Sequence, residues 1–321
     1  MKKALVCGAG GFIGSHLVTF LKKKGFWVRG ADLKFPEYGD TDADEFQIFD
    51  LKLLKNCQKA IEGVNVVYQL AADMGGAGYV FSKDNDANIM HNSALINLLM
   101  ADLAVKHKSE KMFYSSSSCI YPEHNQMDPN NPNCAEDTAY PANPDSCYGW
   151  EKLFSENMYT AFHRNFKLPI RIARFHNIFG ECGSWNNGKE KSPAALSRKI
   201  AEAKNGDTIE IWGPGTQTRS FLYLEECLYG IDLLMKSAWI GPVNIGSTEM
   251  ISINNLAYLI MDIAGKKLEI RNVPGPMGVM GRNSDNRLIK KKLDWAPSKP
   301  LRYGLEKLYC WIEKQVKAKN E

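Results

Sequence analysis

The 321-residue sequence lacks several features that would assign it to a class at once. No stretch approaches the ~20 apolar residues of a membrane-spanning helix, so we expect no membrane anchor. The net charge of +4 is too small to indicate a nucleic-acid partner. The eight cysteines include no CxxC pair and no Cys/His cluster with zinc spacing, so we expect no metal. The absence of internal repeats and low-complexity tracts gives no sign of a repeat protein or a disordered chain.

The composition that remains is that of an ordinary globular protein, with 44% apolar and 24% charged residues. The length suits one large domain with a smaller lobe, or two domains. The first seven residues superficially resemble a signal peptide, but glycines interrupt the apolar run at once and favour a first strand. Cys119 and Cys147 need reduced thiols if either reacts, which favours a cytoplasmic location.

Strand and helix patterns alternate through the first half of the chain. We expect strands over residues 3–7, 27–32, 64–70, 111–116 and 170–174, and helices over residues 12–23, 89–106 and 148–166. This alternation predicts an α/β fold, a parallel doubly wound sheet with helices on both faces. After residue 174 the pattern loosens into two long loops, 180–192 and 273–286, and loops of that length usually have a function.

A glycine-rich segment joins the first expected strand to the first expected helix. Glycines allow the backbone to approach a pyrophosphate, and the helix N-terminus offers it free N–H groups. Asp32 ends the second strand, where a carboxylate accepts hydrogen bonds from the adenosine ribose and repels a 2′-phosphate, so NAD is favoured over NADP. Lys34 weakens that preference slightly, and Asp50 suits an adenine contact or a helix cap equally well. The predicted NAD-binding residues here are Gly8, Gly11, Phe12, Ile13, Gly14, Asp32, Asp50 and Leu51.

Tyr148 and Lys152 are four residues apart and lie on one helix face. A lysine beside a tyrosine lowers the pKa of the phenol, so that the phenolate can take a hydroxyl proton as hydride leaves to NAD. Ser117 is placed to hydrogen-bond the same hydroxyl. A Tyr-xxx-Lys pair by itself is most often a surface pair, and Ser117 by itself is one more polar strand end. The glycine-rich start of the chain favours the catalytic interpretation, with Tyr148 and Lys152 also in contact with NAD.

Six segments of the chain resemble the GDP-mannose 3,5-epimerase family of the extended short-chain dehydrogenase/reductase superfamily, whose members modify nucleotide sugars. The segments are 71–76, 117–123, 174–178, 190–195, 217–221 and 281–286, and the resemblance covers almost the whole chain. It implies a Rossmann-type NAD-binding domain over residues 1–175 and about 219–248. A smaller C-terminal α/β lobe over residues 176–218 and 249–321 would then bind the nucleotide sugar.

The resemblance also implies a proton-transfer pair, Cys119 and Lys191. Oxidation at the sugar C4 by NAD gives a ketone, which acidifies the protons at C3 and C5. A base on one ring face and an acid on the other then invert these centres, and re-reduction at C4 regenerates NAD with GDP-L-galactose and GDP-L-gulose as products. Without the resemblance, Cys119 would be interpreted as a small buried residue and Lys191 as a solvated one.

The substrate-binding residues implied by the family are spread over the chain. Arg219 and Arg282 match the positions that bind the diphosphate, a task that suits the arginine fork. Pro214 and an insert over residues 126–142 depart from the family pattern and leave open a modified mannose or a heptose. The full implied set is Gly75, Ser117, Ser118, Cys119, Asn177, Glu190, Lys191, Ser192, Lys199, Gln217, Arg219 and Arg282.

Two alternatives to this function stay open. A C4 epimerase or C4 oxidase of another nucleotide sugar would use Tyr148 and Ser117 without carbon proton transfer, and a non-catalytic NAD-binding regulator would keep the fold alone. Dehydration is disfavoured, because the sugar 4,6-dehydratases carry an Asp-Glu pair where this chain has Ser118 and Cys119. Relatives also imply a homodimer in which helices 89–106 and 148–166 pair with their copies.

Overall fold

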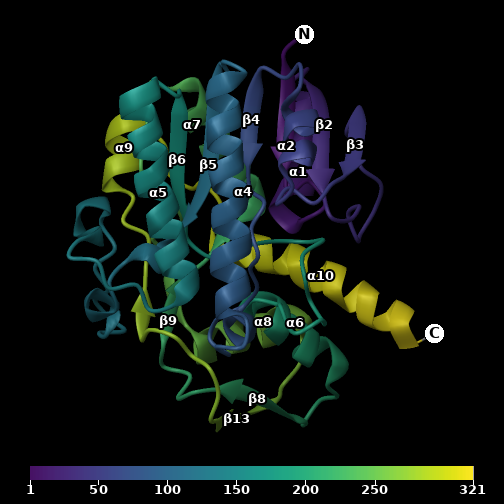
Figure 1. Cartoon of the computed structure of the whole chain (residues 1–321). Helices are drawn as coiled ribbons and strands as arrows, with labels where there is room; N and C mark the ends of the chain where they lie inside the picture. The colour runs from purple at the N-terminus through teal and green to yellow at the C-terminus, as the bar shows by residue number, and fades with distance from the viewer. Residues whose placement is uncertain (321) are drawn as a thin grey trace.

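A seven-stranded parallel sheet forms the larger part of the molecule in the computed structural model, which describes residues 1–320 (Figure 1). Its strands run in the order β11, β6, β5, β4, β1, β2, β3. They are β1 (Lys3–Cys7), β2 (Trp27–Asp32), β3 (Glu45–Ile48), β4 (Val66–Gln69), β5 (Lys111–Ser117), β6 (Ile170–Phe175) and β11 (Val243–Ile245). The order reverses between β1 and β4, and ligands of doubly wound sheets bind at such a switch point.

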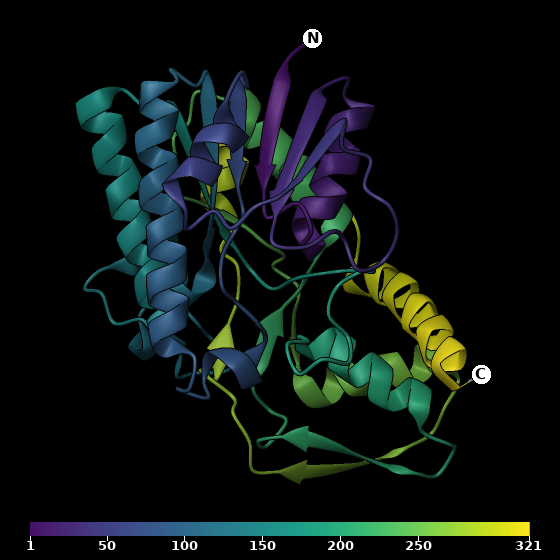
Figure 2. The ribbon, with the colours of Figure 1, turned by 45° about the vertical axis from the view of Figure 1, so that its right-hand side comes forward.

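Helices cover both faces of this sheet. Helices α1 (Phe12–Lys23) and α7 (Leu224–Lys236) enclose one apolar core, and α2 (Leu54–Ile61), α4 (Asp86–Lys106) and α5 (Cys147–Phe166) enclose the other. Strand β1 supplies alternate residues to the two cores, because successive side chains of a strand point to opposite faces. Helices α4 and α5 lie side by side in both views (Figures 1 and 2).

The second lobe has a third apolar core, built by α6 (Ser192–Glu202), α8 (Ile253–Ala264) and α10 (Leu301–Asn320). Below it, β8 (Thr208–Trp212) and β13 (Glu269–Val273) form a two-stranded parallel ribbon (Figure 2). The remaining elements are β7 (Ile178–Phe179), β9 (Thr218–Ser220), β10 (Leu222–Tyr223), β12 (Met250–Ser252), β14 (Gly281–Arg282), α3 (Ala77–Val80) and α9 (Arg287–Leu293), with 3₁₀ turns η1 (Ser118–Ile120), η2 (Glu123–Gln126) and η3 (Glu136–Ala139).

The predicted fold class is confirmed, and β1, α1 and β2 have the predicted bounds. Other bounds differ by a few residues, as ends of elements commonly do: α4 begins at Asp86, and β4 is shorter than residues 64–70. The prediction did not include the sheet strands β3 and β11 or the covering helices α2 and α7. The division into 1–175 with 219–248 and the remainder stays a prediction, although β11 pairs with β6 in the large sheet. Within residues 1–320, no helix is long and apolar enough to cross a membrane.

Candidate active site

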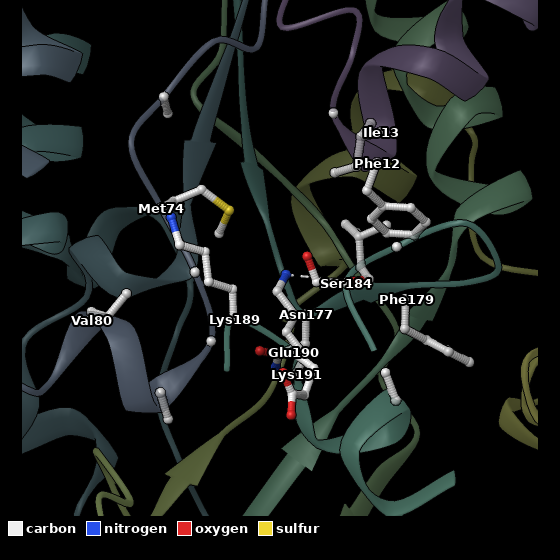
Figure 3. A pocket seen from close by; sticks show the side chains of 18 of the residues that line it. Phe12, Ile13, Met74, Val80, Asn177, Phe179, Ser184, Lys189, Glu190 and Lys191 are labelled. Atoms are coloured by element: carbon white, nitrogen blue, oxygen red, sulfur yellow. Dashed lines mark hydrogen bonds between the residues drawn. The ribbon is translucent and has the colours of Figure 1, made fainter. Parts of the chain in front are cut away.

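One cavity of about 860 Å³ lies between the carboxyl ends of the large sheet and the second lobe. Figure 3 shows Phe12 and Ile13 from the start of α1 on one side, Met74 and Val80 on the other, and Lys191 between them. Every residue predicted to bind NAD or substrate contributes to its lining. The structure therefore brings together in one space all the residues that the sequence selected from distant segments.

The glycine-rich turn has the shape that a dinucleotide requires. Gly8 has a left-handed φ of +84°, and a Cβ added to Gly14 would lie 1.9 Å from the Gly8 carbonyl oxygen. Helix α1 begins at Phe12, and its N-cap Gly11 offers no side-chain acceptor to the first turn. The first N–H groups of the helix have no partner within it, and the residues that carry them line the cavity. This segment fits a pyrophosphate group.

Asp32 lines the cavity at the end of β2, as expected for the ribose-binding carboxylate. Its Oδ2 accepts a hydrogen bond of 2.9 Å from the Gly10 N–H. Burial raises the pKa of Asp32, and the backbone N–H of Gly10 is the largest opposing influence. Lys34 forms an ion pair of 3.1 Å with Glu37. This pair partly neutralises the cation that weakened the preference for NAD.

Asp50 and Leu51, which were predicted from the sequence to bind NAD, both line the cavity. The Asp50 Oδ1 accepts a hydrogen bond of 3.0 Å from the Lys52 N–H, while α2 begins at Leu54 with Leu53 as its N-cap. The helix-cap alternative for Asp50 is therefore wrong, and the carboxylate instead stabilises a turn. Leu51 is buried at the cavity wall.

Tyr148 and Lys152 occupy the buried first turns of α5, with the Lys152 ammonium 5.6 Å from the centre of the Tyr148 ring. The expected lowering of the phenol pKa is wrong for this structure. Burial raises the pKa of Tyr148, the Cys119 thiol adds to the rise, and a contact with Ser117 opposes it. Lys152 Nζ donates to the Ser115 carbonyl oxygen at 2.9 Å, and burial lowers its own pKa. For the pKa of Tyr148, desolvation thus outweighs the attraction between the phenolate and the Lys152 ammonium that the sequence spacing suggested.

Cys119 follows β5 in the short turn η1 and is a free thiol. The Ser117 hydroxyl accepts a hydrogen bond of 3.2 Å from the Cys119 N–H, which fixes the turn. The Cys119 sulfur accepts a hydrogen bond of 3.1 Å from Arg282 Nη1. Ser118, which precedes Cys119 in the turn, is buried and also lines the cavity. Cys119 is thus held at the cavity wall next to Tyr148.

Lys191 is the N-cap residue of α6, at the end of the long loop 180–191. Its ammonium donates to the Ile178 carbonyl oxygen at 3.4 Å. Burial lowers the pKa of Lys191, and the negative charge of a Cys119 thiolate is the largest opposing influence. The two groups are therefore close enough to interact electrostatically. A partly desolvated lysine near a cysteine can act with it as an acid–base pair.

The segment around Gly75 packs against the loop that carries Lys191. A Cβ added to Gly76 would lie 2.3 Å from the Glu190 carbonyl oxygen, and Gly76 N–H donates to the Lys189 carbonyl at 2.9 Å. The Glu190 carboxylate pairs with Arg198 at 3.4 Å, and its second oxygen has no partner among the described residues. Gly75 and Ser192 lie on the cavity wall beside these residues.

Arg219 and Arg282, the predicted diphosphate ligands, are adjacent because β9 pairs with β14. Arg282 is neutralised by Asp145 at 2.8 Å. Arg219 donates only to backbone carbonyls, and no carboxylate within residues 1–320 forms an ion pair with it. Burial and then the Arg282 charge lower the pKa of Arg219 to about 10. A half-buried cation without an anionic partner suits a diphosphate.

The other predicted substrate ligands keep donors or acceptors near the cavity. Gln217 donates to the Trp212 carbonyl at 2.8 Å, and its buried Oε1 has no partner among the described residues. Lys199 donates to the Glu210 carbonyl at 2.6 Å. Asn177, with a left-handed φ of 44°, donates to the Ser220 carbonyl at 2.9 Å.

Two polar residues at the site were missed by the sequence analysis. Gln126 accepts a hydrogen bond of 2.6 Å from Arg282 Nε, and Asp145 accepts one of 2.8 Å from Arg282 Nη2. Gln126 lies at the start of the segment that departs from the family pattern. No sequence spacing connects either residue to Arg282, which is more than 130 positions away in the chain.

Comparisons with known proteins agree with this geometry. The model of the NAD dependent epimerase/dehydratase family matches residues 4–246. GDP-mannose 3,5-epimerase of Arabidopsis thaliana is 45% identical over 98% of this chain and 83% of its own length. GDP-mannose 3,5-epimerase 1 of Oryza sativa subsp. japonica is 44% identical over 97% of this chain and 82% of its own length.

A solved structure adds to these relatives. UDP-glucuronic acid 4-epimerase from Bacillus cereus, in complex with UDP-glucuronic acid and NAD, superposes with a TM-score of 0.83. It is 27% identical, and the match covers 98% of this chain and 99% of that one. These findings confirm the resemblance found in the sequence. The chain is an NAD-dependent enzyme of the NAD dependent epimerase/dehydratase family and belongs, within it, with the GDP-mannose 3,5-epimerases.

Proposed function

We propose that this enzyme epimerises GDP-mannose at C3 and C5, and that Cys119 and Lys191 carry out the proton transfers. The observation that carries the proposal is the meeting of a thiol and a desolvated lysine in the cavity that also holds Tyr148. A C4 epimerase needs no carbon acid–base pair. The relatives named GDP-mannose 3,5-epimerase support the choice of substrate.

The residues of the chain divide the reaction between them. When bound at the glycine-rich turn, NAD supplies a reversible hydride acceptor. Tyr148 takes the proton of the C4 hydroxyl and later returns it, with Ser117 hydrogen-bonded to the same oxygen. Because burial raises the pKa of this phenol in the protein alone, the step requires that the cationic ring of NAD, when bound, favours the phenolate. Cys119 and Lys191 remove and return protons at C5 and C3 while C4 is a ketone, because the carbonyl acidifies its neighbouring C–H bonds. Lys152 holds the strand end through the Ser115 carbonyl.

Arginine side chains and polar atoms without a partner in the protein bind the substrate. Arg219 binds the diphosphate, since it is half-buried at the cavity wall without a carboxylate partner, and Arg282 lies beside it. The Gln217 Oε1 and Glu190 Oε2 atoms, which have no partner among the described residues, accept hydrogen bonds from hydroxyl groups of the sugar. Lys199, Asn177, Ser118, Ser192 and the backbone at Gly75 complete the contacts.

Incubation with GDP-mannose in heavy water tests this function. Deuterium at C3 and C5, with L-galactose and L-gulose products, is the expected result by mass spectrometry and NMR. An epimerised product without deuterium would show that the enzyme is a C4 epimerase. The absence of any product or exchange with any of several GDP- and UDP-sugars would indicate an NAD-binding regulator.

We also propose a homodimer in the cytoplasm. Helices α4 and α5 pack side by side and leave large apolar side chains exposed on their outer surface. These are Met90 and Leu98 on α4 and Trp150 and Phe154 on α5, each 40–48% exposed. A second copy would cover them as a four-helix interface. The free thiol of Cys119 requires a reducing compartment, which supports the location.

A further inference from the structure

The guanidinium of Arg282 is held in one place by three side chains. Its Nη1 donates to Cys119 Sγ at 3.1 Å, its Nε to Gln126 Oε1 at 2.6 Å, and its Nη2 to Asp145 Oδ2 at 2.8 Å. The ion pair with Asp145 is nearly dry, with side chains 6% and 4% exposed. A planar fork whose three nitrogens each donate a hydrogen bond cannot turn without breaking several bonds at once.

The three partners come from parts of the chain that are distant in sequence. Arg282 lies on β14, which is anchored by its pairing with β9. Gln126 ends η2, and Asp145 precedes α5 by two residues. Ser146 links Asp145 to that helix: its hydroxyl donates to Asp145 Oδ1 at 3.1 Å and accepts from the Gly149 N–H at 3.3 Å. The arrangement therefore joins the Cys119 thiol to the helix that carries Tyr148.

Several charged groups face the Cys119 thiol, but only Arg282 hydrogen-bonds its sulfur among the described residues. Lys152, Lys191 and Arg219 interact with it electrostatically, as do the Tyr148 phenol and the Cys134 thiol. A guanidinium in contact with sulfur stabilises the thiolate over the thiol. Asp145 alone, as a negative charge nearby, would have the opposite effect.

We propose that Asp145 and Gln126 are positioning residues, which hold Arg282 so that one N–H remains on the Cys119 sulfur. The N–H on the sulfur then stabilises a Cys119 thiolate when one forms, and that thiolate accepts a carbon-bound proton to become a thiol. This role rests on the proposed function, because it presupposes that Cys119 transfers protons. Neither residue touches the sulfur in the hydrogen bonds of the structure, and each acts through Arg282.

The pH dependence of Cys119 alkylation tests the proposal without any substrate. The enzyme with bound NAD is treated with iodoacetamide between pH 5 and 10, and mass spectrometry measures the rate at the peptide that contains Cys119. We expect Asp145→Asn and Gln126→Met each to raise the midpoint of the profile by about one pH unit, a tenfold change in thiolate fraction. Arg282→Lys, which keeps the charge but loses the fork, should also raise it.

The direction of the shift decides between positioning and simple charge. If Asp145 acted only through its own charge, Asp145→Asn would lower the midpoint, and an unchanged or lowered midpoint in both variants would overturn the proposal. Gln126→Met changes no charge, so it tests the proposal by itself if Asp145→Asn does not fold. Glu156→Gln is the matched control, because it breaks the equally buried pair with Arg174 and should leave the midpoint unchanged. If the wild type failed to exchange deuterium into GDP-mannose, the proposed function would be refuted. The alkylation profile would still be a separate test of how Arg282 is held, because it uses no substrate.

Discussion

Gly149 lies directly against Cys119: a Cβ built on Gly149 would be 2.2 Å from the Cys119 carbonyl oxygen. The helix that carries Tyr148 therefore packs on the backbone of the turn that carries the thiol. Only glycine allows this approach, although its φ lies outside the left-handed region. The proximity of the redox group and the proton-transfer group thus depends on a missing side chain.

Replacement of Gly149 by alanine should separate these two groups. Because the clashing atom is backbone, the first turn of α5 must move, and we expect a loss of roughly 1–3 kcal/mol of stability together with most of the deuterium exchange. Thermal unfolding and exchange from heavy water measure both effects. Gly25→Ala is the control: its left-handed φ of +82° costs about 1–2 kcal/mol, but exchange should persist. Full exchange in Gly149→Ala would show that the close packing is dispensable.

The first βαβ unit could be predicted to the residue because its glycine-rich turn marks the end of β1 and the start of α1. Strand β3 gave no comparable signal, since it is a short edge strand with exposed and polar residues. Strand β11 is only three residues long, and part of the second lobe and helix α7 lie between it and its partner β6 in the sequence. Short elements stabilised by tertiary pairing are the ones that local patterns do not show.

The candidate site divides in the same way. Helical spacing placed Tyr148 and Lys152 on one face, but burial, which reverses the expected pKa of the phenol, is not visible in the sequence. Cys119 and Lys191 were selected only through family resemblance. Gln126 and Asp145 escaped notice because the pairing of β14 with β9 is what brings Arg282 to them.

Replacement of Cys119 by alanine should abolish carbon exchange while leaving NAD bound. The thiol provides the proton-transfer group, whereas the glycine-rich turn that binds NAD is on another segment. Mass spectrometry of GDP-mannose in heavy water and the bound nicotinamide content measure the two properties separately. Cys147→Ala, beside Tyr148 in the helix, is the matched thiol control and should retain exchange. Undiminished exchange in Cys119→Ala would refute the assigned role.

Replacement of Arg219 by methionine should weaken nucleotide-sugar binding. Removal of one partner of a desolvated charge pair costs about 2–5 kcal/mol, which is roughly 30-fold or more in Kd. Calorimetric titration with GDP measures the effect, since the guanidinium is expected to contact the diphosphate. The exposed Arg271 provides the control, because Arg271→Met removes the same charge away from the cavity. Equal GDP affinity in wild type and Arg219→Met would place the diphosphate elsewhere.

Replacement of Phe154 by glutamate should convert the proposed dimer into a monomer. Phe154 is 48% exposed on the outer surface of α5, and a charge there would be buried unpaired at the interface. Sedimentation velocity at micromolar concentration measures the change. Tyr258→Glu, at an exposed aromatic on α8, should leave the mass unchanged. A wild type that sediments as a monomer at every concentration would refute the homodimer.

His176 should make the enzyme less stable in acid. Its ring is fully buried, its Nε2 lies 2.9 Å from Asn244 Oδ1, and burial lowers the pKa of His176 to about 3. The unfolded chain takes up a proton below pH ~6.5, whereas the folded one does not until about pH 3. The contribution of His176 to the free energy of unfolding is therefore largest above pH ~6.5. It decreases as the pH falls below that value, because proton uptake then favours the unfolded state.

Chemical denaturation of wild type and His176→Gln across pH 7 to 4 measures this contribution. Glutamine can still donate to Asn244 but does not titrate, so the free energy of unfolding of the wild type should fall more steeply. The difference should approach about 1.4 kcal/mol per pH unit between pH ~6 and ~4. His91→Gln, at a solvent-exposed position, should keep the wild-type slope. Parallel slopes for wild type and His176→Gln would mean that the buried ring accepts a proton in the folded state, despite its burial and the nearby charges of Arg174 and Arg282, which lower the pKa of His176.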